Sequence, residues 1–452
     1  MKKTAFIFCL LLALLPLAGF SQTNDSALYR WAAQDYMLGD WDGMRPWLSS
    51  RGVDFEFFYA GSLPDNLAGG LRTGGVYQGA VFTTMDVDSQ KTLGYAGGTF
   101  HVSGLWLHGQ KPFSADYSGD LNRVNLLDFD NALRLGELWY RQRFFDSKLS
   151  LKVGQLAVDS DFIVPEYYSS ACQFPLLNQT FFYPTLAYTV FDIPGFPTTP
   201  HGLATTPFAT PGAVTSWDPS PMLGVQYGLY SGAPDRSSTG TKFPISRDDG
   251  ALNYLELAYH HNPATNNPHL GGSYKIGGYY HTSTFADTYE GVFYAAGLGP
   301  TPSRHQGNYG IYLLAEQQLY LEHGKADPAQ QGLTAFVRAL GAPADRNLVQ
   351  FEFDGGLVYR GLFPKRDWDT LSLAASYLEF SDLIARAQRD INGFAPGSFV
   401  PADYEGVVEL NYKVQATAWW TVQASLQHVW HPGGSAATPD ATALIVQTTL
   451  RF

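Results

Sequence analysis

From Gly52 to Phe452 the chain is a series of short segments in which hydrophobic and polar residues alternate, separated by Gly, Pro, Asn and Asp. A period of two residues places successive side chains on opposite faces of a β-strand, and almost no stretch shows the period of about 3.6 residues that an amphipathic helix has. The pattern predicts an all-β fold. About fifteen strands are expected, at Val53–Ser62, Val76–Val87, Thr99–His108, Arg134–Phe145, Lys148–Val158, Leu223–Tyr230, Leu252–His260, Ser273–Thr282, Asn308–Leu321, Leu333–Leu340, Val349–Arg360, Thr370–Phe380, Tyr404–Lys413, Trp419–Trp430 and Ala441–Phe452.

The segment Arg134–Phe145 shows the alternation most clearly. Apolar side chains share one of its faces and charged side chains dominate the other, with Leu138, Tyr140 and Phe144 set against Glu137, Trp139, Arg141 and Arg143. The next segment, Lys148–Val158, repeats the pattern after a turn at Asp146 and Ser147. The two segments together predict a β-hairpin.

Alternation of this kind is compatible with two architectures. In a soluble β-sandwich the polar face is the wet exterior, whereas in a transmembrane barrel the apolar face meets lipid and the polar face lines the lumen. Three features favour the barrel: segments near the roughly ten residues that a tilted strand needs to span a bilayer, aromatic residues near segment ends, and a final segment ending on Phe452. A less regular segment near residues 203–214 supplies the even strand number of single-chain bacterial barrels, so we predict a transmembrane antiparallel β-barrel of about 16 strands.

Two parts of the chain do not read as strands. Trp41, Met44 and Leu48 have helical spacing, and Pro46 fits the first turn of a short amphipathic helix that starts near Gly43. The second part, residues 161–221, is rich in Pro, Phe, Tyr and Thr and alternates little. Its aromatic content favours a packed functional loop region, which we expect to constrict the channel.

The N-terminal residues have the layout of a secretory signal. Lysines precede an apolar stretch from Ala5 to Leu17, and small residues follow it before Gln22. The whole chain has 29 basic and 41 acidic residues and a formal net charge of -12, which argues against electrostatic binding of nucleic acid. Cys9 belongs to the signal, and Cys172 is then a single cysteine, so neither an intramolecular disulfide nor a cysteine-based zinc site is expected.

No pattern typical of an enzyme stands out. The sequence has no His-Glu-x-x-His helix, no Gly-x-Ser-x-Gly elbow and no phosphate-cradling Gly-rich loop before a helix. We expect no catalytic residue, no metal and no cofactor. An outer-membrane barrel hydrolase, with Ser and His at the rim, or an adhesin is the remote alternative.

Charged side chains of the predicted strands must point into the lumen if the apolar faces contact lipid, because charge in lipid is costly. Many of them would form salt bridges and solvate the wall. Both signs of charge beside aromatic rings suit neutral polyhydroxy solutes, because hydroxyls donate and accept hydrogen bonds while C–H faces stack on rings. The residues expected along the solute pathway are Glu137, Trp139, Arg141, Arg143, Lys152, Lys275, His281, Glu352, Arg360 and Glu405, and Glu316, Glu409, Lys413, Tyr279, Tyr312 and Tyr320 are also expected to turn inward.

Several short motifs in series resemble the OprB-type carbohydrate-selective porins of Gram-negative outer membranes. They occur in the family's order and extend over essentially the whole chain beyond the signal. The motifs are Leu38-Gly-Asp-Trp-Asp-Gly-Met-Arg45, Glu137-Leu-Trp-Tyr-Arg141, Lys148-Leu-Ser-Leu-Lys-Val-Gly-Gln155, Tyr274-Lys-Ile-Gly-Gly-Tyr-Tyr-His-Thr282, Gly361-Leu-Phe-Pro-Lys-Arg366 and Gln427-His-Val-Trp-His-Pro-Gly-Gly434.

The resemblance implies a sixteen-stranded barrel with a short N-terminal periplasmic helix and long loops folded inward to narrow the channel. By this resemblance Glu137 and Arg141 belong to a lumen-facing charged ladder. The segment from Asp40 to Arg45 corresponds to the periplasmic helix. It also identifies the stretch around Phe162 to Gln173 as a constriction loop. The constriction residues that follow are Phe162, Tyr167, Tyr168 and Phe174.

The chain is therefore expected to have three parts. Residues 1–21 would be a signal peptide, 22–51 a periplasmic segment with the short helix, and 52–452 the outer-membrane barrel. The expected function is passive, carbohydrate-selective diffusion of glucose and related sugars, and a general or anion-selective porin on the same scaffold is the alternative. Expected partners are small neutral sugars, outer-membrane lipid and lipopolysaccharide, with no nucleic acid, and both a monomer and a homotrimer are compatible with the sequence.

Overall fold

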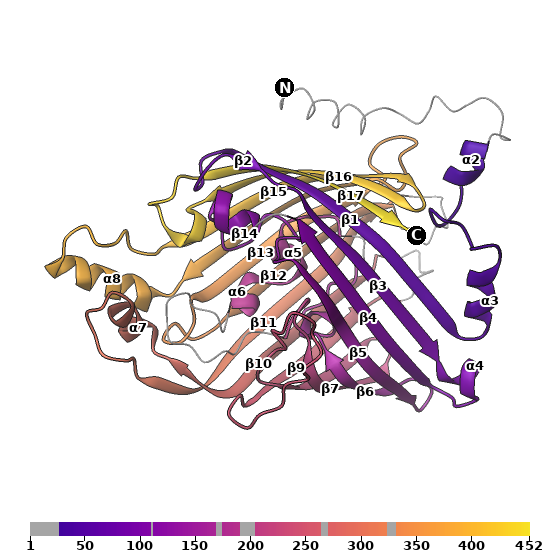
Figure 1. Ribbon diagram of the computed structural model, residues 1–452, viewed down its shortest axis with the longest axis horizontal. Helices are drawn as coiled ribbons and strands as arrows, with labels where there is room; N and C mark the ends of the chain where they lie inside the picture. The colour runs from indigo at the N-terminus through magenta and orange to yellow at the C-terminus, as the bar shows by residue number, and fades with distance from the viewer. Residues whose placement is uncertain (1–26, 110–111, 169–173, 190–203, 264–269, 323–330) are drawn as a thin grey trace.

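The computed structural model describes residues 27–109, 112–168, 174–189, 204–263, 270–322 and 331–452. In these ranges sixteen long strands form one antiparallel sheet in which sequence neighbours pair, and β1 (Val53–Ala68) pairs with β17 (Ala441–Arg451) to close a barrel (Figure 1). A two-residue strand, β2 (Gly74–Gly75), pairs with β1. The expected signal peptide, residues 1–21, lies outside the described residues.

The other strands follow the alternation read from the sequence. They are β3 (Gln78–Asp88), β4 (Gly98–Gly109), β5 (Ala132–Phe144), β6 (Leu149–Leu156), β7 (Thr210–Ser220), β8 (Leu223–Ser231), β9 (Ala251–His261), β10 (Gly272–Ala286), β11 (Arg304–Leu321), β12 (Gly332–Gly341), β13 (Val349–Arg360), β14 (Thr370–Phe380), β15 (Tyr404–Thr417) and β16 (Trp420–Trp430).

The fifteen expected strands are confirmed, including the hairpin of β5 and β6, whose connection uses positive φ angles at Phe145, Asp146 and Ser147. The sixteenth strand exists but is displaced. It is β7, which begins at Thr210, so the expected segment 203–214 overlaps it only in part, and residue 203 lies outside the described residues. Proline at positions 211 and 219 hides the alternation of β7 in the sequence.

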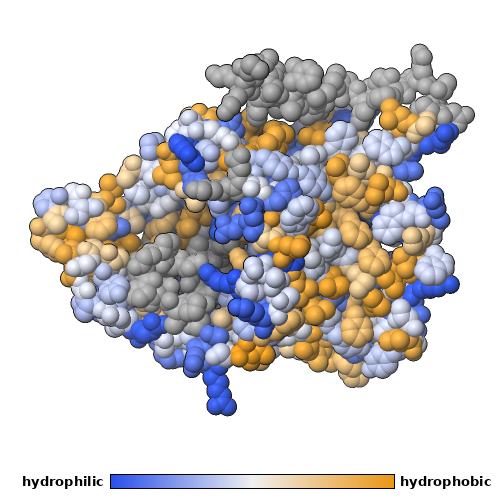
Figure 2. Space-filling view, viewed as in Figure 1, coloured by the Kyte–Doolittle hydropathy of each residue, from blue (hydrophilic) through white to orange (hydrophobic). Residues whose placement is uncertain are grey.

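The apolar face of the strands points away from the barrel axis, as predicted. Leu138, Leu151, Phe353 and Leu410 are all at least 40% exposed, and Figure 2 shows hydrophobic side chains over the outer face of β3 to β6. In the described ranges none of the helices combines the length and the apolarity that a membrane span needs.

Two expected orientations are wrong because the strands contain register shifts. Tyr320 is 46% exposed and lies on the outer face, after a shift between Gln318 and Tyr320 in the pairing of β11 with β12. The alternation of Val349–Arg360 predicts Val349 on the same outer face as Phe351 and Phe353, but Val349 is buried, and the pairing of β13 with β14 shifts between Val349 and Phe351. A bulge reverses the face that a residue occupies, and period-two counting cannot anticipate it.

Seven α-helices of at most 13 residues connect or flank the strands of the described chain. They are α2 (Ala27–Ala32), α3 (Met44–Ser50), α4 (Ser89–Leu93), α5 (Gln179–Phe182), α6 (Thr185–Thr189), α7 (Thr288–Ala295) and α8 (Asp382–Phe394). Helices α2, α3 and α4 lie at the end of the barrel that carries the C-terminus, and α7 and α8 lie at the opposite end (Figure 1). The connections at the C-terminal end are short, as periplasmic turns are, and those at the opposite end are longer, as extracellular loops are.

Helix α3 confirms the helix expected before the barrel. Gly43 precedes it with a φ of 84°, and Pro46 occupies its first turn. Arg45 joins this region to the end of the chain, donating hydrogen bonds to the carbonyl of Phe55 at 2.8 Å and to the oxygen of Phe452 at 2.7 Å. The helix is therefore attached at the seam where β1 meets β17.

The hydrophobic core lies inside the barrel, where two connections fold inward against the wall. We call residues 112–131 the first inward segment, and the described residues of 157–209 the second inward segment. Phe113 and Val124 from the first pack with Leu177 and Phe181 from the second and with Phe336 of β12. The region expected as loop, 161–221, thus ends at residue 209, where β7 begins.

Candidate functional site

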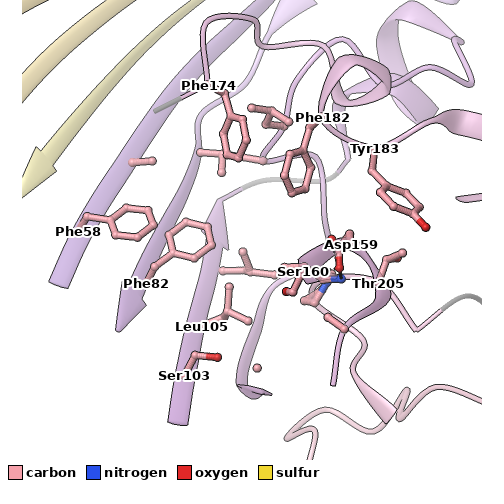
Figure 3. Close-up of a pocket in the computed structure, with 18 of the residues that line it drawn as sticks. Phe58, Phe82, Ser103, Leu105, Asp159, Ser160, Phe174, Phe182, Tyr183 and Thr205 are labelled. Carbon is pink, nitrogen blue, oxygen red and sulfur yellow. Dashed lines mark hydrogen bonds between the residues drawn. The ribbon is translucent and has the colours of Figure 1, made fainter. Parts of the chain in front are cut away.

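A cavity of about 470 Å³ lies within the barrel, between β1, β3 and β4 on one side and the two inward segments on the other. Figure 3 shows Phe58 and Phe82 on one wall, and Asp159 and Thr205 across the open space from them. Phe58, Phe82 and Leu105 are register partners on consecutive strands, and the rings of Phe58 and Phe82 stack at 4.5 Å. The pairing of the first three long strands therefore creates an apolar strip that faces inward.

Six glutamates of the barrel wall face the inward segments and accept hydrogen bonds from their backbone N–H groups. Buried backbone donors need acceptors, and a carboxylate supplies several strong ones. The pairs are Glu137 with Ala157, Glu256 with Ile163, Glu316 with Glu166, Tyr167 and Tyr168, Glu352 with Thr185 and Leu186, Glu405 with Leu121 and Asn122, and Glu409 with Leu177 and Asn178.

The bonds to Glu409, at 2.7 to 2.9 Å, and those to Glu316, at 2.7 to 3.1 Å, have ordinary hydrogen-bond lengths. Glu316, Glu352, Glu405 and Glu409 are fully buried. Carboxylates that the sequence predicts along the pathway therefore point inward but lie beneath the inward segments. They hold the inward segments against the barrel wall, and Glu137 both accepts a hydrogen bond from Ala157 and lines the cavity.

Basic and aromatic side chains gather on β5 and β6. The ring of Trp139 stacks on His101 at 4.6 Å, and the guanidinium carbon of Arg141 lies 4.7 Å from the centre of the same ring. Lys152 is buried, and its Nζ lies 2.5 Å from Oδ1 of Asp161. Arg143 is exposed near the C-terminal end of the barrel. Trp139, Arg141 and Lys152 thus come together in one region of the interior, and Arg143 lies on the same face of β5 nearer the barrel end.

Lys275 belongs to a second charged cluster. Its Nζ lies 2.7 Å from Oε1 of Glu166, and Nδ1 of His260 lies 3.1 Å from Oε2 of the same carboxylate. Burial alone would raise the pKa of Glu166, but these two partners lower it to about 2. Glu166 is therefore ionised at all physiological pH values and holds the second inward segment against β9 and β10.

The remaining predicted residues have separate surroundings. His281 is buried, with Nε2 2.9 Å from the carbonyl of Gly232, and Arg360 is half-buried at the end of β13. Phe162 is buried against Tyr254, with the rings 5.0 Å apart, and Tyr168 stacks on Phe336 at 4.0 Å. Tyr167 is half-buried, Phe174 packs edge-on against Phe182 beside the cavity, and residues 169–173, which include Cys172, lie outside the described residues.

Asp159 is a lumen residue that the sequence reading missed, because no alternation marks the segment that carries it. It lines the cavity and accepts hydrogen bonds from the backbone N–H of Thr206 at 3.0 and 3.1 Å. Burial raises the pKa of Asp159 to about 7, although the bonds from Thr206 offset part of that effect. Its charge therefore changes within the physiological pH range.

This titration predicts a pH-dependent ion selectivity. As the pH rises from 6 to 8, Asp159 gains its negative charge, and the cation-to-anion permeability ratio, measured from reversal potentials in a KCl gradient, should increase. Asp159→Asn should remove this step, and a step that persists in the variant would contradict the assignment. The same pKa shift makes folding stability fall as the pH rises. Because folding raises the pKa of Asp159 above its ordinary value of about 4, the stabilisation from its protonated form is complete below about pH 4 and is lost as the pH rises through about 7.

The apolar strip was also missed. The alternation of Val53–Ser62 places Phe58 and Ala60 on one face, but it does not by itself predict an apolar surface inside the barrel. The available signal was that Tyr59 and Leu63 occupy the other face and are apolar too. In the described ranges no group of three or more His, Cys, Asp or Glu residues is placed to hold a metal ion.

Comparison with known proteins adds a family model and two curated relatives. The model described as carbohydrate-selective porin, OprB family, matches residues 72–452. Porin B of Pseudomonas aeruginosa is 28% identical over 419 residues, which cover 88% of this chain and 87% of Porin B. The putative porin QuiX of Acinetobacter baylyi is 24% identical over 444 residues, which cover 93% of this chain and 93% of QuiX.

Among solved structures, the high-pH structure of OprB from Pseudomonas putida superposes with a TM-score of 0.80 at 24% sequence identity. The match covers 93% of this chain and 99% of that chain. This similarity supports the barrel architecture derived above.

Proposed function

The chain belongs to the OprB family of carbohydrate-selective porins, and from this premise we propose that it lets glucose and related small neutral sugars diffuse passively through its lumen. The protein is a porin of the Gram-negative outer membrane. No bond is made or broken in this function, and no cofactor takes part in it.

The observation that carries the proposal is the narrowed interior. Two inward segments, tied to the wall by buried glutamates, leave a cavity of about 470 Å³ whose lining combines hydroxyl, amide and carboxylate groups with apolar side chains. A sugar has both kinds of surface, because its hydroxyl groups exchange hydrogen bonds and its C–H faces pack on rings. Pore width and the groups that line it together set selectivity.

The residues have different roles in this proposal. Glu137, Trp139, Arg141 and Arg143 line the path, whereas Lys152 is buried and pairs with Asp161 of the second inward segment. Other pathway and constriction residues act by holding the inward segments in place; these are Lys275, Glu352, Glu405, Phe162, Tyr168 and Phe174.

A liposome swelling assay on the purified, reconstituted protein tests the proposed function. Glucose should enter quickly, and entry should fall steeply for larger oligosaccharides and for a charged solute of similar size. Absence of swelling with glucose would overturn the proposal. Liposomes without protein are the control.

Arg141 provides a test of the charged ladder. We expect Arg141→Ala to slow glucose entry by roughly two- to fivefold, since the variant loses a hydrogen-bond donor that stacks on Trp139 beside the path. The measurement is the swelling rate, with Arg30→Ala, on helix α2 outside the barrel, as the matched control. Unchanged glucose entry in Arg141→Ala would remove this residue from the proposed pathway.

One observation favours anion selectivity as a second property. Arg141 and Arg143 occupy the same strand face near the end of the barrel that carries the C-terminus, with Lys152 on the adjoining strand. A reversal potential of the sign expected for a chloride-permeable channel would support it, and a strongly cation-selective channel would contradict it.

A further inference from the structure

The cavity has one wall that is more apolar than free sugars require. Phe58, Phe82 and Leu105 form one row across three strands, and Ala60, Ala80 and Leu107 form the next row. Leu105 and Leu107 are only 6% and 5% exposed, and both face inward while Trp106 between them is 52% exposed on the outer surface. The two rows are therefore one continuous apolar surface, and all of its side chains except Ala80 line the cavity.

The inward segments extend this apolar surface over the cavity. Leu127 packs against Ala60 and Leu107, and Phe174 and Phe182 approach from the second inward segment. Figure 3 shows the two last rings beside the wall formed by Phe58 and Phe82. Aromatic rings on two sides of a cavity offer stacking to a planar, apolar guest.

Two side-chain amides provide hydrogen-bonding groups in the same cavity. Gln179 and Gln447 line it, are 7% and 8% exposed, and each has an Oε1 atom without a hydrogen-bond partner among the described residues. A buried amide oxygen without a donor is costly. Rotation of either amide toward the cavity would let it accept a hydrogen bond from a hydroxyl group of a solute.

We propose that this cavity is a selectivity site for aryl glycosides, sugars that carry an aromatic substituent, and that it favours them over sugars without one. The proposal rests on the sugar-porin function proposed above and names a substrate class for it. The aromatic ring would lie on the wall formed by Phe58, Phe82, Leu105 and Leu107, and the sugar hydroxyls would meet Gln179 and Gln447. A cavity of about 470 Å³ is within the range that accommodates a ligand of two rings.

The test is a titration of channel conductance in planar lipid bilayers with phenyl glucoside and with methyl glucoside. Both probes have the same sugar, and only one has an aromatic ring. Phenyl glucoside should halve the conductance at a concentration about tenfold lower than methyl glucoside does, because stacking of one ring contributes roughly this factor. In the double variant Leu105→Thr, Leu107→Thr the ratio should fall below about threefold, since the wall loses apolar surface.

The matched control is Leu133→Thr, which makes the same chemical change on the outer face of β5, where Leu133 is 72% exposed. This variant should keep the tenfold ratio and shows that the bilayer tolerates the substitution. Equal block by the two glucosides in a channel that still admits glucose would overturn the aryl-glycoside site and leave the sugar porin intact. A ratio that persists in the double variant would also overturn it, and a channel that admits no sugar would overturn both proposals.

Discussion

Replacing Glu316 by alanine should widen the channel. The Glu316 carboxylate accepts hydrogen bonds from the N–H groups of Glu166, Tyr167 and Tyr168 at 2.7, 2.9 and 3.1 Å. Without it three backbone donors, of which that of Tyr168 is buried and the other two are partly buried, lose their acceptor at up to about 1–3 kcal/mol each, so the second inward segment should leave the wall for water. We expect single-channel conductance to rise by roughly a factor of two or more, and trisaccharides to enter liposomes that previously excluded them.

Two variants make this experiment specific. Glu316→Gln keeps one oxygen acceptor but loses the charge, so its conductance should lie between those of the wild type and Glu316→Ala. Glu379→Ala removes a glutamate of β14 that alternates with the buried Leu378 and Phe380, and it should leave conductance unchanged. A folded Glu316→Ala barrel with wild-type conductance would show that Glu316 does not hold the second inward segment.

Breaking the ion pair between Arg338 and Asp354 should cost the most stability. Both side chains are completely buried, and Nε and Nη2 of Arg338 lie 2.9 and 2.7 Å from Oδ2 of Asp354. Nη2 also donates to the carbonyl of Thr180 in the second inward segment. Asp354→Asn leaves the guanidinium buried without a counter-charge, and the free energy of unfolding should fall by about 3–5 kcal/mol.

Urea unfolding of the protein in detergent, followed by the mobility shift of the heat-sensitive barrel in gel electrophoresis, measures this loss. Asp116→Asn is the matched control, since Asp116 pairs with Arg72 at 3.6 Å on the surface, where the Arg72 side chain is 56% exposed. That variant should change stability by less than about 1 kcal/mol. Removing both charges, in Arg338→Met with Asp354→Leu, should recover much of the loss. Similar losses of unfolding free energy for Asp354→Asn and Asp116→Asn would contradict the prediction that the buried pair stabilises the barrel more than the surface pair does.

These two predictions share one physical basis. Charged side chains on the inner wall of this barrel act first as partners for the segments folded inside it, and only some of them meet the solute. Glu352 and Glu405 show the first role, because both are fully buried beneath backbone N–H groups. Arg143, which is exposed, is available for the second.

The sequence by itself determined the barrel. Period-two alternation located fifteen of the sixteen long strands and predicted which faces meet lipid. The alternation is a local property of each strand, and a bilayer requires apolar side chains on the outer face. The short helix α3 was predictable for the same reason, since Gly43 and Pro46 define its start through backbone geometry alone. The alternation of β7 was obscured by its prolines, and Tyr320 and Val349 were misassigned because register shifts depend on the neighbouring strand.

Only the tertiary structure decided what each inward residue does. Glu409 accepts from Leu177 and Asn178, more than two hundred positions away, and no local pattern connects them. The extent of the apolar strip likewise depends on tertiary structure: two apolar faces are visible in the sequence of the first strand, but Phe58 and Leu105 become one surface only when β1, β3 and β4 pair in register. A strand's faces follow from its own residues, but the partner of a lumen side chain is set by where a distant segment folds, and that is a property of the closed barrel.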